Sequence, residues 1–233
     1  MMTDTILIPY EDMLKAGMHF GRRKTVFNPA MQKYVFTVRD GICIIDLLLT
    51  QEKLNETVEF LRNTIAEGKL ILFVSPTTQS REAIATLAEA TGMPYVLDRW
   101  IGGSLTNFKV INSRVKKLEE MESQKEKGEL EKYTKKERMM FDKQMTKMKK
   151  HYEGLKKLTR MPDVVFVASV KEGYLPVAEA RKMNVTLAGI VNTDADPKTL
   201  QYSIPANDRS KISVDLILQA ITTALKNSST QTG

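Results

Sequence analysis

The chain has 233 residues, of which 42% are hydrophobic and 27% are charged, a composition that supports a buried core and excludes wholesale disorder. Its 35 Lys and Arg residues outnumber its 28 Asp and Glu residues, and the resulting net charge of +7 suggests an anionic partner. One cysteine and two histidines exclude an internal disulfide and a His-rich metal site, which indicates a reducing, cytoplasmic setting.

The first third of the chain predicts a small β-element followed by a helix. Two apolar runs, Tyr34–Val38 and Ile42–Ile45, flank Asp40-Gly41, and such an Asp-Gly turn is typical of a β-hairpin. An N-terminal helix precedes this hairpin. A second helix is expected over Thr50–Glu67, because apolar residues recur along one face of it and Gly68 provides a stop.

Short apolar runs then alternate with helical segments. Because these runs lack polar alternation, they predict strands buried on both faces of a parallel sheet. The fold class is therefore α/β: a parallel sheet flanked by helices, doubly wound and similar to flavodoxin or Rossmann folds. The expected strands are Lys69–Ser75, Pro94–Leu97, Val164–Ala168 and Val185–Val191, and the expected helices are Gln79–Thr91, Leu175–Met183 and approximately Ser210–Lys226.

A charged segment rich in Lys, Glu and Met interrupts this alternation. Apolar residues recur there at spacings of three and four, as in a coiled coil. Gly128 marks a turn, and Thr134 with Glu137 matches a capping box at the start of a second helix. We therefore predict an inserted antiparallel helical-hairpin coiled coil over 106–160, an α/β body formed by 1–105 and 161–226, and a flexible tail over 227–233. The two seams are Phe108, Ile111, Val115, Leu118 and Phe141, Met145, Met148, Tyr152, Leu155, Leu158.

The positive charge is concentrated in the insert. Residues Lys109–Arg160 hold 17 Lys and Arg against 9 Asp and Glu, a net charge of +8. The rest of the chain holds 18 basic and 19 acidic residues, a net charge of −1. Since a solvated helical surface usually mixes both signs, this surplus favours contact with phosphates.

Two loops leave an enzymatic alternative open. Gly102-Gly103 lies before a helix and either forms a turn or, with Ser104 and Thr106, binds an anion. Asp194 and Asp196 follow a strand and either bind a divalent cation or form an Asp-rich turn. An enzyme built on these loops would bind a nucleotide or a sugar phosphate, whereas the turn is the favoured interpretation of each. Asn207-Asp208 is interpreted as a helix N-cap pair, Cys43 as a buried small residue and Trp100 as a core anchor.

Several other classes of function find no support in the sequence. No loop carries a Gly-rich dinucleotide or P-loop signature, and we expect no cofactor and no small-molecule substrate. His19 lacks an obvious nucleophile and acid with which to act as a general base. We also expect no membrane partner, because no apolar run is long enough to span a bilayer and Met1–Asp4 lacks the layout of a secretory signal.

A second basic run lies outside the insert. Arg22-Arg23-Lys24 is close to the aromatic residues His19, Phe20 and Phe27 and is followed by Lys33. Consecutive cations repel one another unless a polyanion neutralises them, and nearby rings stack on unpaired bases in many RNA-binding surfaces. A solvated turn is the equally weighted alternative for these residues.

Eight motifs, in one order, resemble the bacterial ribosomal protein S2 family of the small subunit. The resemblance covers approximately residues 10–225, and the charged insert falls where that family has its coiled coil. The most recognisable motif is Arg99–Phe108 (RWIGGSLTNF). The others are Met13–Gly21 (MLKAGMHFG), Asn28–Met31 (NPAM), Gly41–Leu47 (GICIIDL), Met161–Val167 (MPDVVFV), Glu179–Arg181 (EAR), Asp194–Pro197 (DADP) and Ile204–Asp208 (IPAND).

The resemblance implies a structural protein without catalytic activity, located in the small ribosomal subunit. Its partners would be small-subunit ribosomal RNA, at the head–body junction on the solvent side, and neighbouring ribosomal proteins, including protein one, which captures messenger RNA. The chain departs from the usual family pattern at Arg22, 75–78, Asn192 and Ala206. Our predicted RNA-binding residues are His19, Arg22, Arg23, Lys24, Lys33, Arg99, Asn107, Lys109, Arg114, Lys116 and Lys117.

Overall fold

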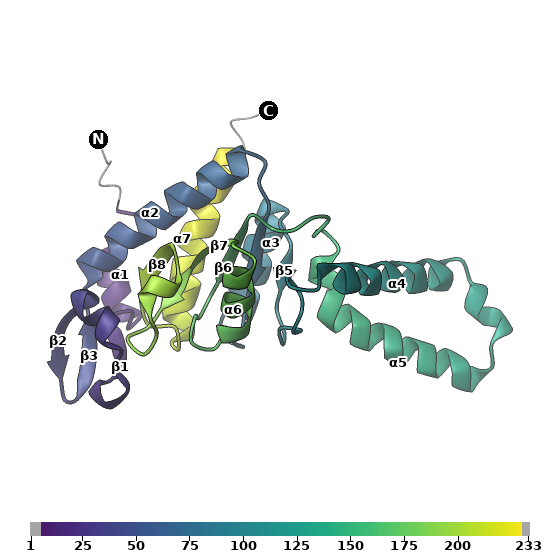
Figure 1. Ribbon diagram of the computed structural model, residues 1–233, viewed down its shortest axis with the longest axis horizontal. Helices are drawn as coiled ribbons and strands as arrows, with labels where there is room; N and C mark the ends of the chain where they lie inside the picture. The colour runs from purple at the N-terminus through teal and green to yellow at the C-terminus, as the bar shows by residue number, and fades with distance from the viewer. Residues whose placement is uncertain (1–5, 230–233) are drawn as a thin grey trace.

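A five-stranded parallel sheet in the order β5-β4-β6-β7-β8 lies at the centre of the molecule (Figure 1). The computed structural model describes residues 6–229, apart from the side chains of residues 131 and 227–229. Every residue of β4 and β6 is buried, which explains why these strands are continuous apolar runs without alternation. The strands are β4 (Ile71–Val74), β5 (Tyr95–Val96), β6 (Val164–Val167), β7 (Thr186–Val191) and β8 (Tyr202–Pro205).

Helices cover both faces of this sheet and confirm the predicted α/β class. On one face, α2 (Leu47–Ala66), α3 (Arg81–Thr91) and α7 (Lys211–Ser229) bury apolar residues against Phe73 and Phe166. On the other face, alternate strand residues such as Leu72 and Val165 pack with α6 and with the base of the insert. The α6 helix spans Tyr174–Lys182.

Several element ends differ from the prediction, and three differences have a clear structural basis or consequence. The α2 helix begins at Leu47, because Asp46 caps it by accepting a hydrogen bond from the Leu48 amide at 2.9 Å. Strand β8 was not predicted; it is a four-residue edge strand that ends in Pro205, where proline is tolerated. The α7 helix continues through Ser229, so the first three residues of the predicted 227–233 tail are helical, and 230–233 lie outside the described residues.

A second, antiparallel sheet stands beside the β8 edge, in the order β1-β3-β2 (Figure 1). The predicted β-hairpin is confirmed, and its turn residues Asp40 and Gly41 have φ angles of 50° and 74°. Strand β1 was not predicted, because four residues that include Gly21 and two arginines show no apolar pattern. The elements are α1 (Tyr10–Lys15), β1 (Phe20–Arg23), η1 (Lys24–Val26), η2 (Pro29–Tyr34), β2 (Val35–Arg39) and β3 (Ile42–Ile45).

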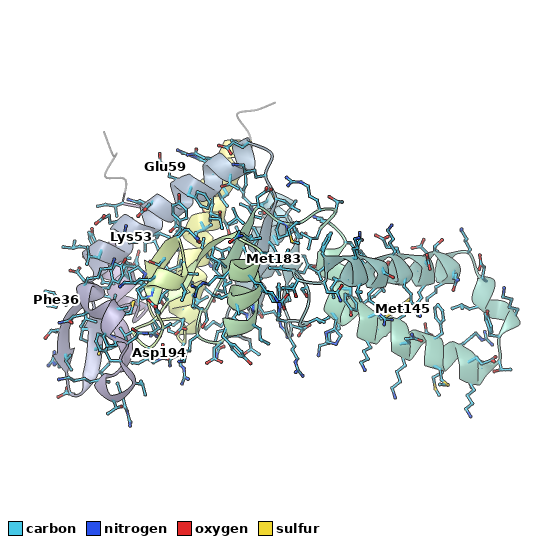
Figure 2. All side chains as sticks on the ribbon, in the orientation of Figure 1. Phe36, Lys53, Glu59, Met145, Met183 and Asp194 are labelled. Atoms are coloured by element: carbon cyan, nitrogen blue, oxygen red, sulfur yellow. The ribbon has the colours of Figure 1, made fainter. Side chains whose placement is uncertain are left out.

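The charged insert forms two helices that run away from the β5 edge and back again (Figure 1). Met145 lies between them (Figure 2), where it packs with Leu118 and Met121. The turn at Gly128 and the capping box of Thr134 and Glu137 are both present as predicted. The segments are α4 (Phe108–Glu126), η3 (Glu129–Lys132), α5 (Lys135–Tyr152) and η4 (Glu153–Leu155), and η5 (Pro197–Thr199) lies farther along the chain, before β8.

Gly154 seats the insert against the sheet. A Cβ atom at this position would overlap with both the carbonyl oxygen and the ring of Tyr95 in β5. We expect Gly154→Ala to lower the free energy of unfolding by about 1–3 kcal/mol, because the backbone must shift to relieve the overlap. Denaturant unfolding measures the loss. Gly102→Ala is the matched control, since a Cβ there meets no atom within 4 Å; an equal effect of both substitutions would contradict the close packing.

Candidate nucleic-acid interface

The predicted RNA-binding residues lie in two groups at opposite edges of the parallel sheet (Figure 1). One group, here called the hairpin-base group, consists of Arg99 in the loop after β5 and Lys109, Arg114, Lys116 and Lys117 on α4. The other, here called the β-module group, consists of Arg23, Lys24 and Lys33 beside β8. The structure therefore does not bring the predicted residues together in a single site.

All five side chains of the hairpin-base group are exposed. None of them forms an ion pair within residues 6–229, whereas Lys149 and Lys156 of the same insert both pair with Glu122, at 2.9 and 2.6 Å. Asn107 is exposed at the N-cap position of α4, and its side chain makes no capping hydrogen bond. The base of the insert thus presents cations whose charge is not neutralised by a neighbouring carboxylate, as binding to phosphates requires.

A β-bulge separates the three consecutive cations of the β-module. Phe20 pairs with Ile44 and Arg23 pairs with Ile42, so two residues of β1 occupy the space of one. Gly21 consequently lies against Thr193, and the Arg22 side chain follows the same inward direction. Arg23 and Lys24 remain exposed.

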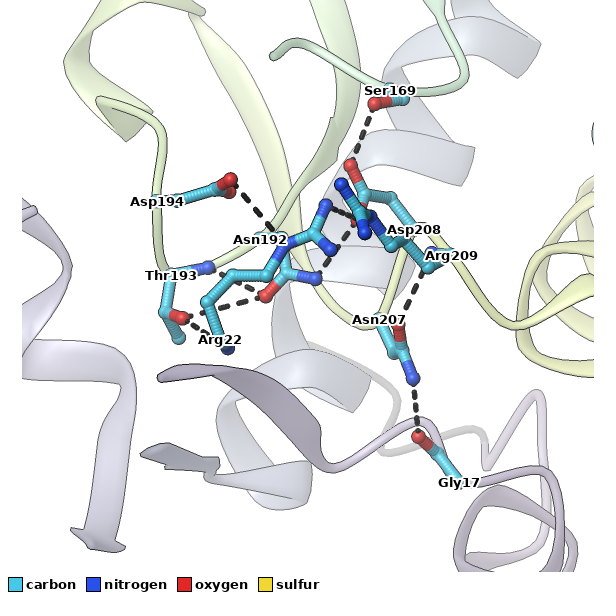
Figure 3. Close-up of polar contacts among 9 residues, drawn as sticks. All are labelled: Gly17, Arg22, Ser169, Asn192, Thr193, Asp194, Asn207, Asp208 and Arg209. Atoms are coloured by element: carbon cyan, nitrogen blue, oxygen red, sulfur yellow. Dashed lines mark hydrogen bonds and ion pairs between the residues drawn. The ribbon is translucent and has the colours of Figure 1, made fainter. Parts of the chain in front are cut away.

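Arg22 is held inside the protein by two carboxylates (Figure 3). Its Nε lies 3.3 Å from Asp194 Oδ2 and its Nη2 lies 3.3 Å from Asp208 Oδ1, and its side chain is only 13% exposed. Its backbone N–H donates to Thr193 Oγ1 at 2.7 Å. Because its charge is neutralised internally, Arg22 is not part of the phosphate-binding surface that we propose below.

Asp208 is the centre of a buried polar network and does not cap a helix as predicted. Its carboxylate accepts hydrogen bonds from Ser169 Oγ at 2.6 Å and Asn192 Nδ2 at 2.9 Å (Figure 3). The Asn207 side chain donates to the Gly17 carbonyl, which lies far away in the sequence, and accepts a hydrogen bond from the nearby Arg209 amide. At the start of α7, the Ser210 hydroxyl accepts a hydrogen bond from the Ser213 amide.

The loop with Asp194 and Asp196 matches the turn interpretation. The cation beside Asp194 is Arg22, while Asp196 accepts a hydrogen bond from the Lys198 amide at 2.9 Å, as in an Asx turn. Residues 6–229 contain no group of three or more His, Cys, Asp or Glu side chains that could hold a metal ion.

Glu179 of α6 fills the Gly102-Gly103 loop from within the protein. Its carboxylate accepts hydrogen bonds from Trp100 Nε1 at 2.9 Å and from the amides of Gly103 and Leu105 at 2.8 and 3.0 Å. Burial raises the pKa of Glu179, but these hydrogen bonds outweigh it and leave the pKa below its usual value. The anion that this loop binds is therefore the carboxylate of Glu179, a residue of the same chain. Trp100 is buried, as expected of a core anchor.

The remaining predicted residues lie around the β-module. Lys33 is exposed, and its Nζ lies 4.6 Å from the centre of the Tyr34 ring. The His19 ring lies 4.0 Å from the Phe20 ring, and burial lowers the pKa of His19, which favours the neutral imidazole. Cys43 is buried as predicted. Arg39 was not predicted as a site residue, and its side chain is 84% exposed. The register of the β2–β3 hairpin pairs it with Ile42.

An open depression of about 300 Å³ lies beyond the carboxyl ends of β4 and β5, where ligands bind in many α/β proteins. Its polar lining includes Thr77, Thr78 and an ion pair between Arg81 and Asp98, and Arg99 stands beside them.

No helix among residues 6–229 is long and apolar enough to cross a membrane.

A family model described as Ribosomal protein S2 matches residues 13–228. The chain belongs to the ribosomal protein S2 family. Three similar proteins, each named small ribosomal subunit protein uS2, come from Parabacteroides distasonis, Rhodococcus opacus and Mycobacteroides abscessus. They are 38%, 37% and 36% identical to this chain over 94% of its length, which corresponds to 78%, 76% and 79% of their own.

Membership of this family confirms the resemblance that the ordered motifs indicated. The S2 proteins are structural constituents of ribosomes, so the chain is not an enzyme and the nucleotide- or sugar-phosphate-binding alternative is set aside. Two departures from the family pattern, Arg22 and Asn192, are neighbours in the fold, because both contact Asp208. Both belong to the internal network around Asp208.

Proposed function

We propose that this S2-family protein is a cytoplasmic constituent of the small ribosomal subunit and binds ribosomal RNA through both basic groups. The observation that carries the proposal concerns eight exposed Lys and Arg side chains that form no ion pair among the described residues. They flank the parallel sheet, and none of them belongs to its apolar core. The insert over 106–160 serves as a separate unit that extends the binding surface away from the body. The names of the relatives, small ribosomal subunit protein uS2, support the assembly.

The two groups suit folded RNA better than a short strand. They stand at opposite edges of the sheet, beyond β8 and beyond β5, so that the rigid α/β body sets their separation (Figure 1). Lysine and arginine contacts to phosphates position a protein without reading the RNA sequence, and specificity then comes from the shape of the RNA. We infer that the protein joins two RNA segments held at a fixed spacing.

The family resemblance further supports a place at the head–body junction on the solvent side and a role in recruiting protein one. We propose both for this chain. Depletion of the protein from cells should leave small subunits that lack protein one after sedimentation, and re-addition should restore it. Retention of protein one in depleted subunits would remove the recruitment role.

Reversing the charge of the β-module should lower the occupancy of the protein in small subunits. Arg23→Glu with Lys24→Glu places two carboxylates where phosphates are expected, while Arg22 and its internal pairs remain intact. Occupancy is measured by quantifying the protein in sedimented subunits at equal expression. The control reverses two exposed cations that belong to neither basic group, Arg181→Glu with Lys182→Glu on α6. Equal occupancy of the two variants would exclude the β-module as an RNA contact.

The function as a whole is tested by the sedimentation of the native protein from a lysate. Comigration with the small subunit, lost progressively as salt is raised, is the expected result. A free pool at low salt would overturn the assignment and favour a role outside the ribosome, such as docking of other proteins on the helical insert.

A further inference from the structure

The three-stranded sheet turns one face towards the body and the other away from it. Cys43 and Ile45 of β3 belong to the inward face and are each only 1% exposed. Ile42 and Ile44 alternate with them and therefore point outward, where they stay partly exposed. The outward face is thus an apolar strip along the central strand of this sheet.

Cross-strand pairing places specific neighbours on both sides of that strip. Phe20, Ile44 and Thr37 form one row, and Arg23, Ile42 and Arg39 form the next, since paired residues share a face. The Phe20 side chain is an exposed aromatic at 45% exposure, and the two arginines are both exposed. The outward face therefore combines one aromatic ring with a guanidinium on each flanking strand. The bulge in β1 is what allows Phe20 and Arg23, three residues apart, to share it.

The charge around this face is almost entirely positive. Residues 20–45 contain five Lys and Arg residues and one acidic residue, Asp40, which lies 4.0 Å from Arg39. Arg22 points inward, which leaves Arg23, Lys24, Lys33 and Arg39 facing solvent. This sign complements a polyanion, whereas a purely apolar docking partner would leave the cations without counter-charges. The His19 ring, in contact with Phe20, widens the aromatic surface.

We propose that the outward face of β1-β3-β2 stacks an unpaired base of the ribosomal RNA on Phe20, while Arg23 and Arg39 bind the adjacent phosphates. This inference rests on the proposed rRNA-binding function and adds a single-stranded contact to it. Stacking on an aromatic ring is tolerant of sequence because every base has a π face, and RNA-binding sheets use exposed rings in this way. The two guanidinium groups lie in the row next to the ring, on two different strands, and would neutralise the phosphates adjacent to the stacked base.

Substitutions at Phe20 test the stacking contact in the full-length protein. Phe20→Ala should weaken binding to purified small-subunit rRNA by roughly 5- to 150-fold, as expected for the loss of one stacked base. Phe20→Tyr should retain the affinity for rRNA and Phe20→Leu should not, since leucine keeps apolar bulk but lacks a ring. The melting temperature of each variant is measured alongside, so that a loss of folding is recognised. The comparison of Phe20→Tyr with Phe20→Leu at equal melting temperature then decides the result.

Fluorescence provides a direct readout. The chain has one tryptophan, the buried Trp100, so a Phe20→Trp variant adds one exposed indole. A short single-stranded oligoadenylate should quench that indole, and the same sequence in an RNA duplex should not. Leu48→Trp, at an exposed position at the start of α2, is the control that should show no quenching.

The outcomes separate this inference from the function on which it rests. Unchanged rRNA affinity in Phe20→Ala and Phe20→Leu, with affinity lost in a hairpin-base variant, overturns the stacking contact and retains rRNA binding. Absence of rRNA binding in the unaltered protein overturns both. Unchanged rRNA affinity combined with lower occupancy of Phe20→Ala in subunits would show that the face docks a neighbouring ribosomal protein and would likewise overturn the inference.

Discussion

Replacing Glu179 by glutamine should lower the free energy of unfolding by about 2–4 kcal/mol, because several hydrogen-bond donors lose the carboxylate that satisfies them. Trp100 Nε1 and the amides of Gly103, Leu105 and Thr106 all point at its two oxygens. A glutamine amide keeps the shape but presents an NH₂ group to some of these N–H donors. Denaturant unfolding of the full-length protein measures the difference.

Lowering the pH should remove the stabilisation that the Glu179 carboxylate provides. The pKa of Glu179 is lower in the folded protein than its ordinary value, so the stabilisation is complete above the unfolded pKa of about 4.3 and declines as the pH falls from there through the folded pKa. The stability difference between the unaltered protein and Glu179→Gln should therefore be constant near neutral pH and shrink in acid.

The control for this substitution is Glu172→Gln. Glu172 is exposed near the start of the same helix, and its side chain forms no hydrogen bond or ion pair within residues 6–229. Its substitution should change stability by no more than about 0.5 kcal/mol. If the two variants are equally stable, Glu179 does not organise the Trp100–Thr106 loop.

The Glu179→Gln substitution should also affect the hairpin-base group of the candidate interface, because the Trp100–Thr106 loop joins the two. The loop that Glu179 holds connects Arg99 to the first turn of α4, which carries Lys109. A loosened loop would therefore misplace the hairpin-base group as well as destabilise the fold.

Neutralising the four α4 residues of the hairpin-base group should weaken rRNA binding on the order of 100-fold at moderate salt and lower the slope of log K against log salt by roughly 3. The variant is Lys109→Gln, Arg114→Gln, Lys116→Gln and Lys117→Gln, four exposed residues that form no ion pair within residues 6–229. Glutamine retains helix propensity, so α4 should persist. Binding is measured by filter retention with purified small-subunit rRNA over a series of salt concentrations.

The insert offers a matched control at its far end. Lys135→Gln, Lys136→Gln, Arg138→Gln and Lys143→Gln remove the same number of charges, including one arginine, from exposed positions on α5. Both variants have the same net charge, so non-specific attraction falls equally in the two. A larger loss in the base variant supports a localised contact, and equal losses would show that the whole insert, and not its base, attracts the RNA.

Features that depend on neighbouring residues in the chain could be predicted from the sequence. The apolar runs of β4, β6 and β7, the 3–4 spacing that buries Leu118 and Met145, the capping box at Thr134 and the Asp-Gly turn at Asp40 all appear in the structure. Each rests on backbone geometry or on burial along one face of one element, which local residue order specifies. The concentration of charge in the insert is likewise a property of the sequence.

Which polar residues are available to a partner depends on how distant segments of the chain pack together. Arg22 and Arg23 are adjacent in the sequence, yet a bulge turns Arg22 towards Asp194 and Asp208, more than 170 residues away, while Arg23 faces solvent. Glu179 occupies a loop 73 or more residues before it. A cation binds phosphate or a carboxylate according to which lies nearer, and distances between remote segments are set by packing. The sequence determined that this protein carries a basic surplus for a partner, and the fold determined which cations remain free to meet it.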